Sequence, residues 1–253
     1  MAVARLPPPN PASVTGGPRG AFLAPPWLPP AAVAADSDSP SQEQGSVPVW
    51  MFGYGSIIWN PDVPHVDTVD GYISPFRRVF YQASTQHRGS DDLPGRVATL
   101  IQPADIGATA EPHDPSWRVY GRAYRLPDER AAALLEDMKE RESVGYHHTT
   151  ATVYAPDGTV VVEHAACNVA DVKNDLWRGR TAEERDDAAV AAVIARAHGP
   201  SGPNAEYVIK LDEALTKMGF GDEHVRSLMG HLERLRAKDG GRAGKGMVRR
   251  RGR

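Results

Sequence analysis

One carboxylate of this 253-residue chain falls where a proton-transferring group is expected. Apolar residues recur at helical spacing after the start signal Pro127-Asp128, at Ala131, Leu134, Leu135 and Met138. Because an α-helix repeats about every 3.6 residues, Glu142 continues the apolar face of Leu135 and Met138. Burial raises the pKa of a carboxyl group and makes it a better base near neutral pH. Glu142 is therefore a candidate general acid/base, and a carboxylate paired with an arginine at the helix end is the structural alternative.

A glycine-rich turn follows the first apolar run, residues 47–51. The chain there reads Phe52-Gly53-Tyr54-Gly55-Ser56-Ile57-Ile58-Trp59-Asn60, which is typical of a strand that ends in a tight loop. Such a loop can turn backbone N–H groups toward a ligand, as anion-binding nests do. The alternative is a glycine-rich strand end that binds nothing.

Arginines cluster in three stretches, residues 77–78, 86–89 and 94–96. The planar guanidinium fork suits carboxylates, so these arginines are candidates for contacts to an acidic ligand. Adjacent Arg77 and Arg78 point to opposite faces of an extended chain, so at most one of them would face a pocket. For each arginine the alternative is a solvated surface position.

Other reactive residue types give weaker signals. His147 and His148 are adjacent in a predicted strand and face opposite ways, which argues against a shared metal. Cys167 is the only cysteine, so an intrachain disulfide is excluded, and a buried inert thiol is favoured over a nucleophile. Tyr207 follows a Gly/Pro loop at a helix start, where packing of its polar tip is the structural alternative to a ligand contact.

The composition is that of an ordinary globular domain with unlike ends. Apolar residues make up 41%, charged residues 24%, and the net charge is -3, which gives no reason to expect a nucleic-acid or membrane partner. Residues 1–46 are rich in Pro and Ala and are predicted to be disordered, with an organelle transit peptide as the alternative. Residues 238–253 are predicted to form a basic disordered tail, for which a nucleic-acid patch is the alternative. A cytoplasmic protein is expected, and the oligomeric state is open, with a monomer favoured.

The domain between these ends, residues 47–237, begins with strands and ends with helices. Short runs rich in aromatic and β-branched residues predict strands at 79–81, 96–101, 117–124, 149–154 and 159–163. The turn sequence Ala155-Pro156-Asp157-Gly158 predicts a hairpin between the last two. Residues 102–115 are predicted to form a surface loop. Helices are expected from Asp128, from the capping box Thr181–Glu184 to His198, through Leu211 to Gly219, and from Asp222. This order indicates an α+β fold with helices packed on a curved sheet or barrel.

In order along the chain, several motifs resemble the ChaC-type γ-glutamylcyclotransferases. The opening motif is Phe52-Gly53-Tyr54-Gly55-Ser56-Ile57-Ile58-Trp59, and further matches occur at residues 77–80, 84–89, 94–97, 121–126, 141–146 and 199–207. The resemblance covers roughly residues 49–236. It departs at Val144-Gly145-Tyr146, where the family often has Gly-Gly-Tyr.

The resemblance implies a small mixed β-barrel flanked by helices and an enzyme that releases 5-oxoproline from glutathione. The other product is cysteinylglycine, and no water is consumed and no metal or other cofactor is needed. The family's catalytic glutamate matches Glu142. Its substrate loop matches Tyr54, Gly55, Ser56 and Ile57, whose N–H groups would bind the γ-glutamyl part. Further candidates for substrate contacts are Arg78, Arg88, Arg96 and Tyr207. The alternatives are a cyclotransferase for other γ-glutamyl peptides or amines, or a non-catalytic binding module.

Overall fold

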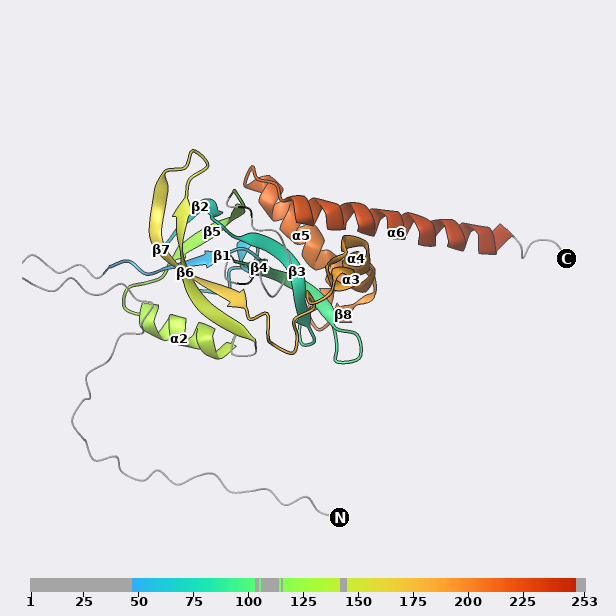
Figure 1. The fold of residues 1–253 in the computed structure, drawn as a ribbon, viewed down its shortest axis with the longest axis horizontal. Helices are drawn as coiled ribbons and strands as arrows, with labels where there is room; N and C mark the ends of the chain where they lie inside the picture. The colour runs from blue at the N-terminus through green and yellow to red at the C-terminus, as the bar shows by residue number, and fades with distance from the viewer. Residues whose placement is uncertain (1–46, 103–104, 106–113, 115, 142–144, 249–253) are drawn as a thin grey trace, which may run out of the picture. The chain divides into compact units, whose positions relative to one another are not determined.

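A computed structural model of the chain describes residues 47–248, except 103–104, 106–113, 115 and 142–144. Contacts divide the chain into two units, Met1–Ser37 and Asp38–Arg253, and all described residues belong to the second. Its strands are β1 (Trp50–Gly53), β2 (Asp67–Ile73), β3 (Arg77–Ser84), β4 (Gly95–Ile101), β5 (Val119–Arg125), β6 (Tyr146–Tyr154), β7 (Val160–Ala170), β8 (His198–Gly199) and β9 (Gly202–Pro203) (Figure 1). Its helices are η1 (Ser56–Ile58), α2 (Ala131–Arg141), α3 (Ala182–Arg185), α4 (Asp187–Arg196), α5 (Asn204–Lys217) and α6 (Glu223–Val248).

Five strands form a closed barrel in the order β1-β5-β2-β6-β7. Antiparallel pairs make up most of it, and the parallel pairing of β1 with β7, Met51 opposite Ala166, closes the circle. Because β6 runs antiparallel to β7, with Tyr146 opposite Ala170, β6 begins at the barrel end where β1 finishes. The barrel and its helices confirm the predicted α+β fold.

The β6–β7 hairpin is confirmed, and its turn shows why. Gly158 adopts φ of 90°, a left-handed conformation that side chains resist, and its amide donates to the Ala155 carbonyl at 2.9 Å. The turn residues predicted from the sequence therefore connect β6 and β7, whose register shifts between Ala151 and Tyr154.

Strands β3 and β4 form a second, two-stranded sheet with a register shift between Val79 and Gln82. A hydrophobic core joins residues of the barrel, such as Phe52 and Val153, to Leu100 of β4, Val208 of α5 and Leu228 of α6. The helices thus pack against the barrel through one continuous apolar cluster, which fixes the substrate-loop candidate, residues 54–57, relative to them.

The region from Thr181 onward forms two helices where the sequence predicts one. The capping box is present, since the Thr181 side chain accepts from the Glu184 amide and Glu184 reaches back to the cap. Asp186 then takes an extended conformation, ends α3, and caps α4 by accepting from the Ala189 amide at 2.8 Å. A second N-cap residue inside the predicted helix, Asp186, therefore ends α3 and starts α4.

The strand β2 was not predicted, because Asp67 and Asp70 break the apolar pattern of its sequence. Helix α2 is confirmed from Ala131 onward, whereas the predicted loop at 102–115 and residues 1–46 fall largely or wholly outside the described residues. Helix α6 runs to Val248 and so includes part of the segment predicted as a disordered tail. Within the described part of the chain, no helix has the length and apolar character needed to cross a membrane.

Candidate active site

The glycine-rich turn lies at the end of β1 and is held from inside the domain. Tyr54 is buried, and its hydroxyl donates to the Asn168 carbonyl of β7 at 2.6 Å. Ser56 is exposed, and the chain then winds into η1, where the Ile58 amide donates to the Gly55 carbonyl at 3.1 Å. The turn therefore has one side anchored in the barrel and one side open to solvent.

Two backbone N–H groups of this turn are available to donate hydrogen bonds to a ligand. No described residue accepts a hydrogen bond from the amides of Gly55 or Ile57. The Ile57 carbonyl, by contrast, accepts from the Tyr124 hydroxyl at 2.7 Å, so the carbonyl side of the turn is fixed by the barrel. Backbone amides on a fixed turn that have no acceptor among the described residues are the features of an anion- or oxyanion-binding site.

Tyr207 packs directly against this turn from the first part of α5. A Cβ atom on Gly55 would lie 2.7 Å from the Tyr207 hydroxyl, so a side chain at position 55 would displace the tyrosine. The ring packs edge-on against Trp59 and Phe80. Burial raises the pKa of Tyr207 to about 12, opposed by backbone hydrogen bonds with Ala98 and Ser56 and by nearby Arg78. The hydroxyl therefore stays protonated at neutral pH and ties α5 to the turn.

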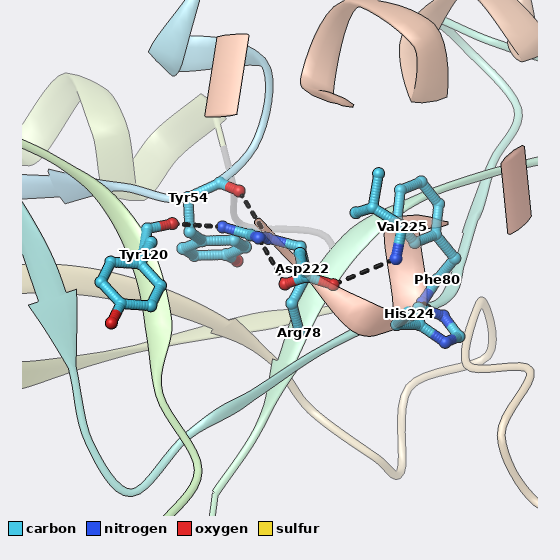
Figure 2. Close-up of polar contacts among 7 residues, drawn as sticks. All are labelled: Tyr54, Arg78, Phe80, Tyr120, Asp222, His224 and Val225. Atoms are coloured by element: carbon cyan, nitrogen blue, oxygen red, sulfur yellow. Dashed lines mark hydrogen bonds and ion pairs between the residues drawn. The ribbon is translucent and has the colours of Figure 1, made fainter. Parts of the chain in front are cut away.

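Arg78 lies behind the turn, with 1% of its surface exposed. Its Nε donates to the Tyr54 carbonyl at 3.0 Å, its Nη1 to Asp222 Oδ2 at 2.6 Å, and its Nη2 to the Tyr120 carbonyl. Figure 2 shows these contacts converging on one guanidinium from the turn, from β5 and from the start of α6. Each nitrogen of the Arg78 guanidinium therefore has an acceptor within the protein.

Arg88 is bound to the segment that leads into α5. Its Nη1 donates to the Pro203 carbonyl and to Glu206 Oε2, both at 3.1 Å, and its guanidinium lies 5.8 Å from the Tyr207 ring centre. Hydrogen bonds from Lys210 and then from Arg88 lower the pKa of Glu206. Arg88 thus reaches the candidate site through Tyr207 and through the loop before α5.

Arg96 differs from the other two arginines. Its backbone is clamped by Asn204, whose Oδ1 accepts from the Arg96 amide at 2.6 Å and whose Nδ2 donates to the Arg96 carbonyl at 2.8 Å. Its side chain is buried, and no residue that the structure describes accepts a hydrogen bond from its Nε. Burial, reinforced by the nearby Arg178, lowers the pKa of Arg96 to about 10. This arginine therefore carries donor capacity that the described protein does not use.

Glu142, the predicted general acid/base, lies outside the described residues. Its described neighbours frame it: α2 ends at Arg141, and β6 starts at Tyr146. Gly145 adopts φ of 84° and its carbonyl accepts from Asn174 Nδ2 at 2.9 Å, which fixes the start of β6. That start lies at the same end of the barrel as the turn.

The histidines of β6 have polar partners near the same end. His147 Nε2 lies 3.0 Å from Gln102 Nε2, and His148 Nδ1 lies 2.6 Å from Asn168 Oδ1. Across the described residues, His, Cys, Asp and Glu form no group of three that could hold a metal ion. Burial raises the pKa of Cys167 to about 12, so this thiol is protonated at neutral pH.

The structure brings together most of the residues predicted from the sequence. Tyr54, Gly55, Ser56 and Ile57 form the turn, Arg78 and Tyr207 support it, and Arg88 contacts Tyr207. Their roles as substrate contacts stay predictions, as does that of Arg96. Sequence reasoning missed Tyr124, Asn168 and Asp222 as supports. Only the helix-start signal at Asp222 pointed to one of them.

Comparisons with known proteins agree on one family. The sequence matches the family model described as ChaC-like protein over residues 49–235. Glutathione-specific gamma-glutamylcyclotransferase 1 of Rattus norvegicus is 34% identical over 206 residues, covering 79% of this chain and 86% of that relative. The glutathione-specific gamma-glutamylcyclotransferase of Escherichia coli is 30% identical over 194 residues, covering 76% of each chain. The crystal structure of a yeast gamma-glutamyl cyclotransferase specific to glutathione is similar with a TM-score of 0.63 and 28% identity, covering 75% of this chain and 100% of that one.

Proposed function

This chain belongs to the ChaC-like family, and from that premise we propose that it is a glutathione-specific γ-glutamylcyclotransferase. Relatives named for this activity are similar over most of their own length, which supports glutathione as the substrate. The observation that carries the proposal is the turn Tyr54–Ile57. Arg78 and Tyr124 hold its Tyr54 and Ile57 carbonyls, while the amides of Gly55 and Ile57 have no acceptor among the described residues.

The reaction is an intramolecular amide exchange. The α-amine of the γ-glutamyl group attacks its own γ-carbonyl carbon, a C–N bond forms, and a five-membered ring closes. The amide bond to cysteine then breaks, which releases 5-oxoproline and cysteinylglycine. The attacking nitrogen begins as an ammonium and ends as a lactam N–H, so it loses one proton before the attack and a second as the ring forms. The leaving nitrogen gains one proton as the amide bond breaks and a second in solution, so one group that accepts and then donates a proton can serve both nitrogens.

The turn supplies two of the terms that such a reaction needs. The unpaired amides of Gly55 and Ile57 can donate to the γ-carbonyl oxygen as negative charge develops on it. Holding the γ-glutamyl group still also keeps the amine near the carbonyl carbon, which removes an entropic cost. In this proposal Glu142 moves the proton.

Formation of 5-oxoproline and cysteinylglycine from glutathione tests the proposed activity. We expect turnover by the wild-type protein and a fall in kcat of at least about 100-fold for Glu142→Gln, the range of general acid–base catalysis. Glu129→Gln, at an exposed position just before α2, removes a carboxylate of the same chemistry and should leave kcat unchanged. An inactive wild type would refute the activity, and a fully active Glu142→Gln would refute the assignment of the base.

A panel of γ-glutamyl dipeptides and γ-glutamylamines tests the substrate. The ratio of kcat/KM values for glutathione and for each competitor measures discrimination directly. We expect glutathione to be preferred over the other γ-glutamyl compounds. Equal ratios would assign a broader γ-glutamyl specificity, and tight binding of glutathione without turnover would indicate a binding module.

A further inference from the structure

The start of α6 contacts the turn through one buried ion pair. Asp222 Oδ2 accepts from Arg78 Nη1 at 2.6 Å, with 10% and 0% of the respective side chains exposed. The other oxygen of Asp222 accepts from the Val225 amide at 3.0 Å and so caps the helix. Figure 2 shows the carboxylate of Asp222 between the Arg78 guanidinium and the Val225 amide. One carboxylate therefore serves both the helix start and the arginine behind the turn.

A second contact holds the connection between α5 and α6 against the barrel. Phe220, in the connection between α5 and α6, stacks on Tyr120 with ring centres 4.3 Å apart. The carbonyl of Tyr120 in turn accepts from Arg78 Nη2. This connection therefore contacts β5 through the Phe220–Tyr120 stacking and through the hydrogen bonds of Arg78. These contacts hold Asp222 in a fixed position beside Arg78.

The peptide plane between Tyr54 and Gly55 transmits this contact to the site. A trans peptide is planar, and its C=O and N–H point in opposite directions. Because Arg78 Nε binds the Tyr54 carbonyl, the Gly55 amide is directed away from Arg78, where no described residue accepts from it. Rotation of this peptide would break the Arg78 hydrogen bond and turn the amide inward.

We propose that Arg78 and Asp222 are positioning residues, and that the first turn of α6 sets the direction of the Gly55 amide that serves the substrate. This inference rests on the proposed cyclotransferase activity and adds the part of the fold that prepares its oxyanion-binding turn. Arg78 acts through the peptide it holds, since each of its nitrogens donates to the protein and 1% of its surface is exposed. Asp222 acts one step further away, by orienting Arg78.

Substitutions of Asp222 test this inference, with Asp187→Asn as the matched control. Asp187 also pairs with the first part of α6, at 3.2 Å from His224 Nδ1, and no hydrogen bond or ion pair among the described residues links it to Arg78 or the turn. Asp222→Ala removes the cap and the ion pair, whereas Asp222→Asn keeps an oxygen acceptor. Steady-state kinetics with glutathione and with a second γ-glutamyl substrate, and hydrogen exchange of the segment 54–60, are measured for all three variants and the wild type.

We expect Asp222→Ala to lower kcat/KM by between about tenfold and about 100-fold, the loss typical of a slightly misplaced site. The loss should be equal for both substrates, because the turn holds their common γ-glutamyl part. Asp222→Asn should lose less, and both variants should exchange the amides of 54–60 faster than wild type. Asp187→Asn should change neither kinetics nor exchange in that segment.

Each outcome bears on one of the two hypotheses. Unchanged kcat/KM and unchanged exchange in folded Asp222 variants would overturn the positioning role, as would equal losses in Asp187→Asn. If Asp222→Ala does not fold, the comparison of Asp222→Asn with Asp187→Asn decides. If the wild type is inactive on glutathione, the proposed function fails, and the exchange of segment 54–60 still shows whether Asp222 orders the turn.

Discussion

Two buried arginines lie on neighbouring strands of the β3–β4 sheet and have opposite surroundings. Arg78 on β3 has an acceptor at every guanidinium nitrogen: two backbone carbonyls and the carboxylate of Asp222. Arg96 on β4 is buried near Arg178, its Nε has no hydrogen-bond partner among the described residues, and its pKa is lowered to about 10. Burial alone therefore does not distinguish an arginine whose donors are all bound within the protein from one that has unused hydrogen-bond donors.

The difference lies in where each guanidinium is used. Asn204 clamps the backbone of Arg96, and no described carboxylate forms an ion pair with the Arg96 side chain. Asp222 neutralises Arg78 and connects it to a helix cap. Removing one partner of a buried pair leaves the other charge uncompensated and destabilises the fold, whereas an arginine that is buried without a carboxylate partner already costs stability. Substitution by methionine at three arginines that differ in burial and in pairing tests this difference.

The largest effect is expected for Arg78→Met. Removing Arg78 leaves the Asp222 carboxylate and the carbonyls of Tyr54 and Tyr120 without their donor. Breaking a buried pair in this way typically lowers the free energy of unfolding by about 3–5 kcal/mol. Urea denaturation followed by circular dichroism measures the change. A loss below about 1 kcal/mol would show that the pair stabilises little and would remove the contrast with Arg96.

The local features of the fold could be predicted from the sequence, because they depend on residues that are close together along the chain. The glycine-rich turn, the hairpin at Gly158 and the capping box of Thr181 and Glu184 all appear in the structure. Each is specified by backbone conformation or by a side chain reaching a nearby amide. The start of a helix at Asp222 belongs to the same class.

The supports of the site could not be predicted, because they join distant parts of the chain. Arg78 and Asp222 are 144 positions apart, and Tyr54 and Asn168 are 114 apart. Only the closure of the barrel and the docking of α6 bring these pairs together. The sequence makes Arg78 a candidate for a substrate contact, because a guanidinium suits carboxylates. It gives no sign that the acceptors of Arg78 lie within the protein. Glu142 stays a prediction from helix spacing and family resemblance.

An intermediate effect is expected for Arg122→Met, which supplies an exposed reference for Arg78. Arg122 pairs with Asp70 through Nε–Oδ1 at 2.5 Å and Nη2–Oδ2 at 2.9 Å, yet 31% and 34% of these side chains are exposed. Solvent screens such pairs, so we expect a loss of about 1 kcal/mol or less. The loss should be smaller still in 1 M NaCl, because the Debye length falls to roughly 3 Å at that ionic strength and the salt screens the exposed pair. A loss equal to that of Arg78→Met would show that exposure does not separate the two pairs.

The smallest effect on stability is expected for Arg96→Met. Because burial lowers the pKa of Arg96 to about 10, the folded chain binds this proton less tightly than the unfolded chain. The stability cost is therefore fully present below pH 10 and is relieved as the pH rises through that value. Methionine removes the charge and keeps an apolar stem, so the free energy of unfolding at pH 7 should stay within about 1 kcal/mol of wild type or increase.

The same variant separates a ligand contact from an idle buried charge. If the unpaired donors of Arg96 meet a substrate carboxylate, Arg96→Met should raise the KM for glutathione by about tenfold, the equivalent of a charge-assisted hydrogen bond of about 1.4 kcal/mol. Steady-state kinetics beside the denaturation curve measure both quantities on one preparation. An unchanged KM would remove Arg96 from the substrate site. A stability loss as large as that of Arg78→Met would mean that Arg96, too, is paired within the fold, and the contrast between the two strands would fail.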